Sequence, residues 1–320
     1  MGRSTGFEPA TPRITILCSN QLSYDRRKIG SANIHSRVAA VNYFPGGVAI
    51  ATDAAELGLR PMTRLRLLTF NIAHGRGALP LHQGLRSAAK IRSNLQKIAR
   101  LIQRLNADVV ALQEIDENSR WNGSFDHLAF LSAHTGLAHA VHGVNNRRTG
   151  RFHLNYGNAV LSRFPIVHSE TTTFGFGELG GKGFVFAEIE VPKKGRLPLV
   201  NVHLHHASRA KRLTQSLRLV RYLDEQRKHR AAQWHTPLIL CGDFNNPSHR
   251  PDATATLLDY FERTNRYSLL PKSGRTFPSL LPARTLDYVF LPQECREPKA
   301  EVVRSLASDH CPVLVEFSLP

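Results

Sequence analysis

Short apolar segments recur along the chain from residue 65 onward and constrain its fold more than any other feature. They are rich in Val, Ile, Leu and Phe, residues that favour β-strands. Some alternate apolar with polar residues, whereas others are apolar throughout, and this mixture is typical of two sheets that pack face to face. The predicted strands cover residues 65–70, 109–112, 158–161, 184–191, 197–204, 237–241, 286–291 and 312–317.

Two segments between these strands have the period of an amphipathic helix. Apolar residues recur every three or four positions across 91–105 and again within 207–230, which places them on one face of a helix. The alternation of helices and strands is too irregular for a barrel. We therefore predict an α/β fold in which two packed sheets are covered on the outside by helices.

Residues 1–61 differ from the rest of the chain. They show no sustained period of a helix or strand and mix Gly, Pro, Ser, Asn and Arg without pattern. No apolar region of signal-peptide length follows the amino-terminal charges. We expect these residues to be a disordered or spurious extension, with translation starting at Met62, and residues 62–320 to form a single catalytic domain.

The chain carries a formal net charge of +17 and has a pI near 10.3. This charge attracts anionic partners, which could be nucleic acid, an acidic membrane surface or phosphorylated small molecules. The arginines are spread along the chain rather than gathered in one run, so an ordinary solvated surface remains an open interpretation. The sequence does not indicate an oligomeric state.

The four cysteines are widely separated and include no CxxC pair. This spacing does not indicate a disulfide framework, so we expect reduced thiols and a cytoplasmic location. No segment approaches the roughly 20 apolar residues that a membrane-spanning helix needs. We therefore predict no transmembrane segment.

Several predicted strands end abruptly on a polar side chain. LLTF stops at Asn71, VVALQ at Glu114, LPLVNV at His203 and LILCG at Asp243, with Asn245 two residues later. A rigid strand fixes the position of a side chain at its end, while the open rim of the sheet leaves room for a substrate. We expect these side chains to converge on one rim.

Three further polar residues flank the last strands of the chain. Asp287 begins the run LDYVFL, and Asp309 and His310 immediately precede the final strand. A carboxylate beside an imidazole can form a hydrolytic pair or a metal site. A single Asp or Asn beside a strand is more often a turn or helix cap, but the eight residues together favour one active site.

With these motifs assembled, the chain resembles the endonuclease/exonuclease/phosphatase superfamily, which includes deoxyribonuclease I, neutral sphingomyelinases and inositol-polyphosphate 5-phosphatases. The resemblance spans about residues 65–319, and GDFN and SDH downstream of ALQE form its most specific combination. It implies a four-layer α/β sandwich, with two mixed β-sheets packed face to face and helices on both outer faces. The motifs that carry it are LLTFNI, ALQEID, YGNAVLSRFPI, NVHLHH, CGDFN, LDYVF and SDHCPV, in that order.

The resemblance also implies a divalent-metal site. It makes Glu114 the main metal carboxylate, with Asn71 and Asp309 near the same ion. Hard oxygen ligands suit Mg²⁺ or Mn²⁺, and Mg²⁺ usually keeps several waters with one or two protein carboxylates. The expected cofactor is therefore Mg²⁺, or Mn²⁺ in its place.

The other motif residues take roles in catalysis and substrate binding by the same resemblance. His310, oriented by Asp287, deprotonates or positions the attacking water or stabilises the transition state. Asp243 and Asn245 orient the nucleophile and hold a phosphate oxygen, and His203 is a candidate general acid or phosphate clamp. The residues assigned to substrate binding are Asn158 and Arg209.

Other interpretations of the same residues remain open. His203, His205 and His206 could be zinc ligands, although no matching Cys or second His pair follows them. A chain that keeps the fold without the chemistry would be an anion-binding module, but such a chain should lack catalytic groups that are all present here. Basic residues could also form a phosphate-binding rim or an ordinary charged surface: Lys90, Arg92, Arg147, Arg148, Arg209, Lys211 and Arg212.

The expected reaction is divalent-metal-dependent hydrolysis of a phosphodiester or phosphomonoester. The basic charge favours a nuclease-like enzyme, since Lys and Arg contacts to phosphates strengthen binding to nucleic acid. A phospholipid or phosphoinositide esterase with peripheral contact to an anionic membrane is the alternative, because such an enzyme would also be basic.

Overall fold

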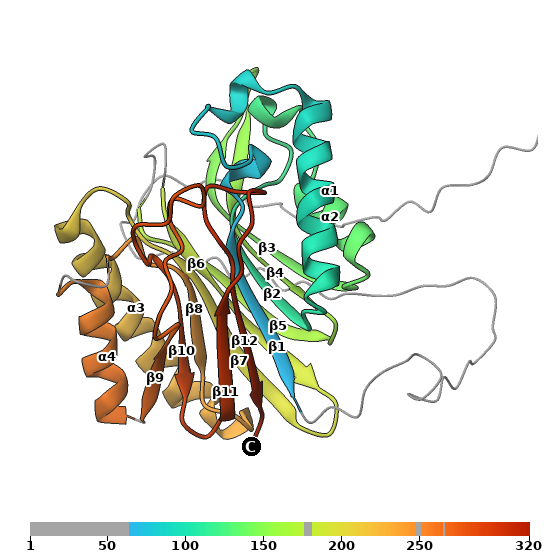
Figure 1. The fold of residues 1–320 in the computed structure, drawn as a ribbon. Coiled ribbons are helices and arrows are strands. Elements are labelled where there is room, and N and C mark those ends of the chain that lie inside the picture. The colour runs from blue at the N-terminus through green and yellow to red at the C-terminus, as the bar shows by residue number, and fades with distance from the viewer. Residues whose placement is uncertain (1–63, 176–180, 248–250, 265) are drawn as a thin grey trace, which may run out of the picture. The chain divides into compact units, whose positions relative to one another are not determined.

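The structure is a computed structural model that describes residues 64–175, 181–247, 251–264 and 266–320. The predictions for residues 1–61 and for a start at Met62 lie outside the described residues. The remaining prediction, one catalytic domain over residues 62–320, stays a prediction. The described residues build two sheets and four α-helices (Figure 1).

Each sheet has six strands. The first has the order β11-β12-β1-β2-β4-β3, and the second has the order β5-β6-β7-β8-β10-β9. Both are mixed, because β1 runs parallel to β2, and β7 to β8, while the other neighbours are antiparallel. The first sheet contains β1 (Leu65–Asn71), β2 (Val109–Asp116), β3 (His139–Arg148), β4 (Leu154–Ser162), β11 (Arg296–Val302) and β12 (Val313–Ser318). The second contains β5 (Ile166–Thr173), β6 (Gly183–Val191), β7 (Gly195–His203), β8 (Ile239–Asp243), β9 (Tyr267–Leu270) and β10 (Asp287–Pro292).

Two helices cover each outer face. α1 (Ala88–Arg104) and α2 (His127–Thr135) contribute to an apolar cluster with the first sheet, and α3 (Arg209–Arg230) and α4 (Ala253–Thr264) to one with the second. Figure 1 shows the two helix pairs on opposite sides of the sheets. The predicted four-layer α/β sandwich is therefore confirmed. Short 3₁₀ turns lie at Ala73–Gly75, Gln83–Leu85, Arg120–Asn122 and Ala231–Gln233.

The central strands are apolar on both faces because both faces are buried. In β1, Leu67 belongs to the cluster between the two sheets, whereas Leu68 and Phe70 belong to the cluster beneath α1 and α2. All three side chains are at most 1% exposed. Alternate side chains of a strand point to opposite faces, so a strand buried on both sides must be apolar at nearly every position.

All eight apolar runs predicted as strands overlap strands of the structure and extend beyond them by at most two residues, and both predicted helices form. α1 begins after Ser87, whose side chain accepts a hydrogen bond from the Lys90 amide, and α3 begins after Ser208 in the same way. An oxygen at this position satisfies an amide that the first turn of a helix leaves unpaired. The sequence pattern did not identify β3, β5, β9, β11, α2 or α4.

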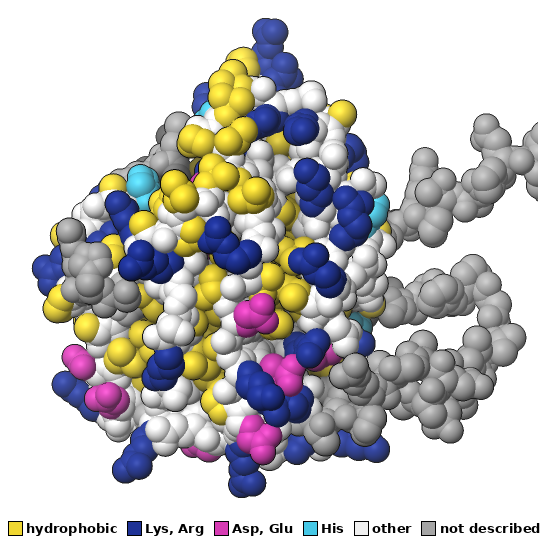
Figure 2. Space-filling model, viewed as in Figure 1, with side chains coloured by type: hydrophobic (Ala, Val, Ile, Leu, Met, Phe, Trp, Pro, Cys, Tyr) yellow, Lys and Arg dark blue, Asp and Glu magenta, His cyan; other side chains and the backbone are white. Residues whose placement is uncertain are grey.

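None of the helices in the described part of the chain combines the length and hydropathy needed to span a bilayer. Cys241, Cys295 and Cys311 are buried free thiols, and Cys18 lies outside the described residues. The cytoplasmic location stays a prediction. On the face in view, Lys and Arg side chains are dispersed rather than gathered in one patch (Figure 2).

The topology brings the carboxyl ends of four strands to one edge of the sandwich. The parallel pairs β1/β2 and β7/β8 end there, and the antiparallel strands β10 and β12 start there. A hydrogen bond from Asn71 Nδ2 to Asp243 Oδ2, 2.9 Å long, joins the ends of β1 and β8 across the two sheets. This edge is where the sequence predicts the site.

Candidate active site

The strand register places the predicted polar residues beside one another. Asn71 pairs with Gln113, the residue before Glu114, and Asp243 pairs with His203 on one side and with Asp287 on the other. Side chains from adjacent strand ends therefore face one shared space. The expectation that these residues converge on one rim is met by their positions.

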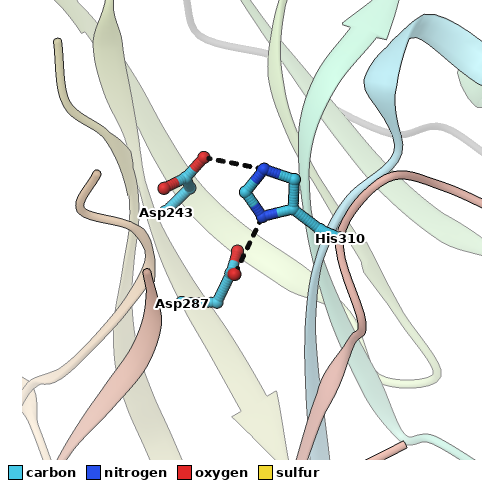
Figure 3. A group of neighbouring side chains, drawn as sticks. All are labelled: Asp243, Asp287 and His310. Carbon is cyan, nitrogen blue, oxygen red and sulfur yellow. Dashed lines mark hydrogen bonds and ion pairs between the residues drawn. The ribbon is translucent and has the colours of Figure 1, made fainter. Parts of the chain in front are cut away.

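Asp287, His310 and Asp243 form a buried chain of three titratable groups (Figure 3). His310 Nδ1 lies 2.9 Å from Asp287 Oδ2, and His310 Nε2 lies 3.7 Å from Asp243 Oδ2. Burial alone would lower the pKa of His310, but the charges of Asp287 and Asp243 outweigh it and raise the pKa to about 10. The imidazole is therefore protonated at neutral pH.

Asp243 is held by amide donors at the end of β8. Its Oδ1 accepts from the Asn245 backbone N–H at 2.9 Å, and its Oδ2 accepts from Asn71. Burial and the charge of Asp287 raise the pKa of Asp243 to about 7, although His310 opposes the rise. Gly242 before it has φ 139°, and a Cβ there would lie 1.9 Å from the Val202 carbonyl oxygen, so the close approach of β7 and β8 requires this glycine.

His203 lies at the end of β7 and is 3% exposed. Its Nε2 lies 2.9 Å from Lys182 Nζ, 3.2 Å from Asn245 Nδ2 and 3.4 Å from Asp243 Oδ2. Burial and the Lys182 charge hold the pKa of His203 well below its usual value. A neutral imidazole accepts a hydrogen bond at one nitrogen and donates at the other, and the lowered pKa makes the ring poorly suited to protonate a leaving group.

Glu114 reaches the site from a bulge in β2. The pairing of β2 with β4 shifts between Gln113 and Ile115, and Glu114 has φ 52°, a backbone conformation that costs energy and is often kept at functional sites. Its Oε1 lies 3.4 Å from Lys182 Nζ and its Oε2 3.6 Å from His74 Nε2. Burial opposes ionisation, but Lys182 and His74 outweigh it and lower the pKa of Glu114.

The three predicted metal ligands share one neighbourhood. Asn71 pairs in the sheet with Gln113, the residue before Glu114. Ser308 Oγ donates to the Asn71 carbonyl at 2.7 Å, which places the adjacent Asp309 near the end of β1. Asp309 pairs with Arg76. Two carboxylates and an amide are hard oxygen donors of the kind that Mg²⁺ and Mn²⁺ bind, so the donor set fits the expected ion.

The group of His, Cys, Asp and Glu side chains in the described residues that has the spacing of a metal site is a different one: Asp243, Asp287 and His310, whose ligand atoms lie within 4.8 Å of one another. In this group Asp287 Oδ2 is already bonded to His310 Nδ1, and the other ring nitrogen faces Asp243. We therefore interpret this group as a proton-bearing pair beside a carboxylate. His205 Nδ1 accepts from the backbone amides of Ala207 and Ser208, which does not support the zinc interpretation.

Three site residues were missed by the sequence analysis. Lys182 contacts both His203 and Glu114, Arg76 pairs with Asp309, and His74 lies between Glu114 and Asp116. Arg76 and His74 lie within five residues of Asn71, and this closeness in sequence was the available signal. Lys182 had no comparable signal, because it precedes β6 and only the folded sheet brings it to His203.

The residues predicted to bind substrate occupy different environments. Asn158 is 1% exposed, and its Nδ2 donates across the sheets to the Gly183 carbonyl at 2.8 Å. Arg209 lies at the start of α3 and donates to the Pro251 carbonyl at 3.1 Å. Within the predicted basic rim, Arg212 is buried against Asp252, so it is not free to hold phosphate. Arg92 stacks on Phe125, with its Cζ 3.8 Å from the ring centroid.

Known proteins are similar to this chain in sequence or in fold. The chain is 27% identical over 272 residues to the uncharacterized protein YbhP of Escherichia coli, covering 79% of this chain and 96% of YbhP. An endonuclease/exonuclease/phosphatase structure from Beutenbergia cavernae has a TM-score of 0.61 at 22% identity, covering 80% of this chain and 72% of that one. The mannosyl-6-phosphatase Bt3783 of Bacteroides thetaiotaomicron has a TM-score of 0.57 at 14% identity, covering 80% and 100%. The sequence pattern of the Endonuclease/Exonuclease/phosphatase family matches residues 68–310, from β1 to the imidazole at the centre of the site, and this chain belongs to that family.

Proposed function

We propose that this chain hydrolyses a phosphodiester with the help of a divalent cation held by Glu114, Asn71 and Asp309. The observation that carries the proposal is the buried chain from Asp287 through His310 to Asp243, set beside an ionised glutamate. The family generally acts on phosphoesters with divalent metals. Every catalytic residue that the resemblance implies is present in this sequence, which argues against an anion-binding module without catalysis.

Each side chain has a role in the reaction that follows from its charge. The metal would neutralise charge on the phosphate, as Mg²⁺ or Mn²⁺ does in hydrolases of this kind. The His310 imidazolium supplies a second positive charge where charge develops on phosphorus oxygens. Asp243, with a pKa of about 7, can accept a proton from water near neutral pH.

Of the two roles predicted for His203, its lowered pKa favours the phosphate clamp over the general acid. His203 Nε2 accepts from Lys182 Nζ at 2.9 Å and from Asn245 Nδ2 at 3.2 Å, and it thereby gathers two donors suited to an anionic oxygen. Lys182 then carries the positive charge of this cluster. The clamp therefore consists of Lys182, His203 and Asn245 acting together.

Nucleic acid is the first substrate class that we propose, since the formal net charge of +17 favours a polyanion. A phospholipid is the second candidate, because the site is bordered by exposed leucines that a polynucleotide would not use. Mg²⁺ or Mn²⁺ serves equally well in this proposal, and a phosphomonoester would engage the same groups.

The test is to incubate the purified chain with plasmid DNA, short RNA, a phosphoinositide and sphingomyelin, each with Mg²⁺, Mn²⁺ or EDTA. Glu114→Ala and His310→Ala serve as inactive controls whose folding is checked by thermal melting. We expect cleavage of one class that EDTA and both variants abolish. Cleavage that persists in both variants, or no cleavage of any phosphoester, would overturn the proposed function.

A further inference from the structure

Large exposed apolar side chains are concentrated at the edge of the sandwich that carries the site. Nine are exposed among the described residues, and seven of these lie in loops at this edge. The other two are Val167 in β5 and Leu217 in α3. Exposed apolar side chains gathered at one edge of a protein often mark an interaction site.

Three of the seven lie in the loop between β1 and α1. Leu79, Leu81 and Leu85 are 55%, 42% and 72% exposed. Arg76, the residue that pairs with Asp309, also donates from Nη1 to the Leu79 carbonyl at 2.8 Å. This loop therefore borders the proposed metal ligands directly.

The other four lie in three loops around the same site. Leu280 and Leu281, 44% and 81% exposed, follow Ser279, whose amide donates to the Asp309 carbonyl at 2.7 Å. Leu306 is 60% exposed and lies two residues before Ser308. Phe152, 59% exposed, lies in the turn from β3 to β4. We call these seven side chains the apolar rim.

The loops that carry the apolar rim are strongly basic, and their one acidic residue, Asp309, pairs with Arg76. Segments 76–87, 149–153, 271–286 and 303–312 hold seven Lys and Arg against this one Asp. In Figure 2, hydrophobic side chains alternate with Lys and Arg over the upper part of the face in view. Exposed apolar side chains beside a net positive charge favour binding to an anionic lipid surface.

We propose that the apolar rim is the surface by which this enzyme docks on an anionic lipid bilayer, so that the site opens toward the headgroups. The leucines enter the boundary between headgroups and acyl chains, and the arginines contact lipid phosphates. A polynucleotide would use the arginines but leave the leucines in water. The inference rests on the proposed function only for the chemistry at the site, since docking itself needs no hydrolysis.

The experiment is cosedimentation of the full chain with sucrose-loaded vesicles of phosphatidylcholine, with and without phosphatidylglycerol, at low and high salt. The rim variant is Leu281→Gln with Leu306→Gln. The matched control is Val167→Gln with Leu217→Gln, which removes two side chains that are 47% and 53% exposed elsewhere. Glu114→Ala is included because it removes the proposed chemistry while leaving the apolar rim intact.

We expect binding to the anionic vesicles that weakens at high salt because charges are screened. The rim variant should bind at least about tenfold more weakly, since two leucines lose their apolar contact, whereas the control and Glu114→Ala should bind as the unmodified chain does. Absence of vesicle binding, or equal loss in the rim variant and the control, would overturn the proposal. The proposal would also be overturned if the rim variant kept its vesicle binding but lost DNA binding, or lost self-association measured by sedimentation velocity. If Glu114→Ala binds vesicles but hydrolyses no substrate, docking is supported independently of the proposed function.

Discussion

Among the buried carboxylate–imidazole pairs in the described residues, two have the same arrangement but different surroundings. In one, His310 Nδ1 lies 2.9 Å from Asp287, and in the other, His74 Nδ1 lies 2.7 Å from Asp116. The far nitrogen of each ring points to a second carboxylate, because His310 Nε2 is 3.7 Å from Asp243 and His74 Nε2 is 3.6 Å from Glu114. The same local unit thus occurs twice in one site.

The two carboxylates differ in how fully they are bonded. Asp116 also accepts from Trp121 Nε1 at 2.8 Å and Asn122 Nδ2 at 2.6 Å. Asp287 Oδ1 is buried without a hydrogen-bond partner. A saturated carboxylate fixes its imidazole in place, whereas one with a free oxygen can adjust as charge moves. We therefore propose that His74 positions Glu114 and that His310 takes part in the chemistry.

The backbone supports the same distinction. Ala73, His74 and Gly75 have φ of 47°, 55° and 72°, and the Ala73 amide donates to Asn71 Oδ1 at 3.0 Å. Three successive residues in this region cost conformational energy, which the surrounding contacts must offset. His74 is therefore held firmly next to the carboxylate that would bind the metal.

The largest effect should come from His310→Ala. Removing the imidazolium that faces Asp243 should lower kcat/KM by about 10² to 10⁴-fold, the range that positioned acid-base groups supply. The affinity for Mn²⁺, measured by electron paramagnetic resonance without substrate, should stay the same. Activity within tenfold of the unmodified chain would contradict the chemical role of His310.

Asp287→Asn should have a smaller effect on the same pair. The amide keeps the shape of Asp287 but removes the charge that does most to raise the pKa of His310, so this pKa should fall from about 10 toward neutrality. We expect kcat/KM to drop by about 10²-fold, with a rate that declines at lower pH than in the unmodified chain. An unchanged histidine titration by nuclear magnetic resonance would show that Asp287 does not hold the proton on His310.

His74→Gln tests the other pair. If His74 positions Glu114, the variant should bind Mn²⁺ about 10 to 100-fold more weakly, as is usual when a residue supporting a metal ligand is lost. His310→Ala is the control, because it should leave Mn²⁺ binding intact. Unchanged Mn²⁺ affinity in His74→Gln, with an unaltered melting temperature, would remove the distinction between the two pairs.

The strands that the sequence did not reveal are the four edge strands. β11 and β3 end the first sheet, and β5 and β9 end the second. β11 has the sequence REPKAEV and is exposed at six of its seven positions. An edge strand is paired on one side only and often carries charged residues that discourage further pairing, so it lacks the apolar run that identified the central strands.

The sequence predicted those site residues that directly follow an apolar strand. Asn71, His203 and Asp243 follow apolar runs that the sequence displays, and the structure brings them together as expected. Lys182 reaches His203 only through the pairing of β6 with β7, a long-range contact that no local period encodes. His74 depends on a left-handed turn, and sequence patterns give little information on such turns.

The smallest expected effect is on the pH dependence of the unfolding free energy. The folded-state pKa of His310 is about 10, above its usual value of 6.5, so its contribution to stability is fully present below pH 6.5 and is lost as pH rises through 10. The difference in unfolding free energy between the unmodified chain and His310→Ala should therefore shrink from pH 7.5 to 10.5 in urea titrations. Taking this difference removes the titration of Lys and Tyr residues common to both proteins. The raised pKa of Asp243, about 7, changes the unfolding free energy mainly below this pH range. A difference that stays constant across the range would therefore mean that His310 is not held protonated by Asp287.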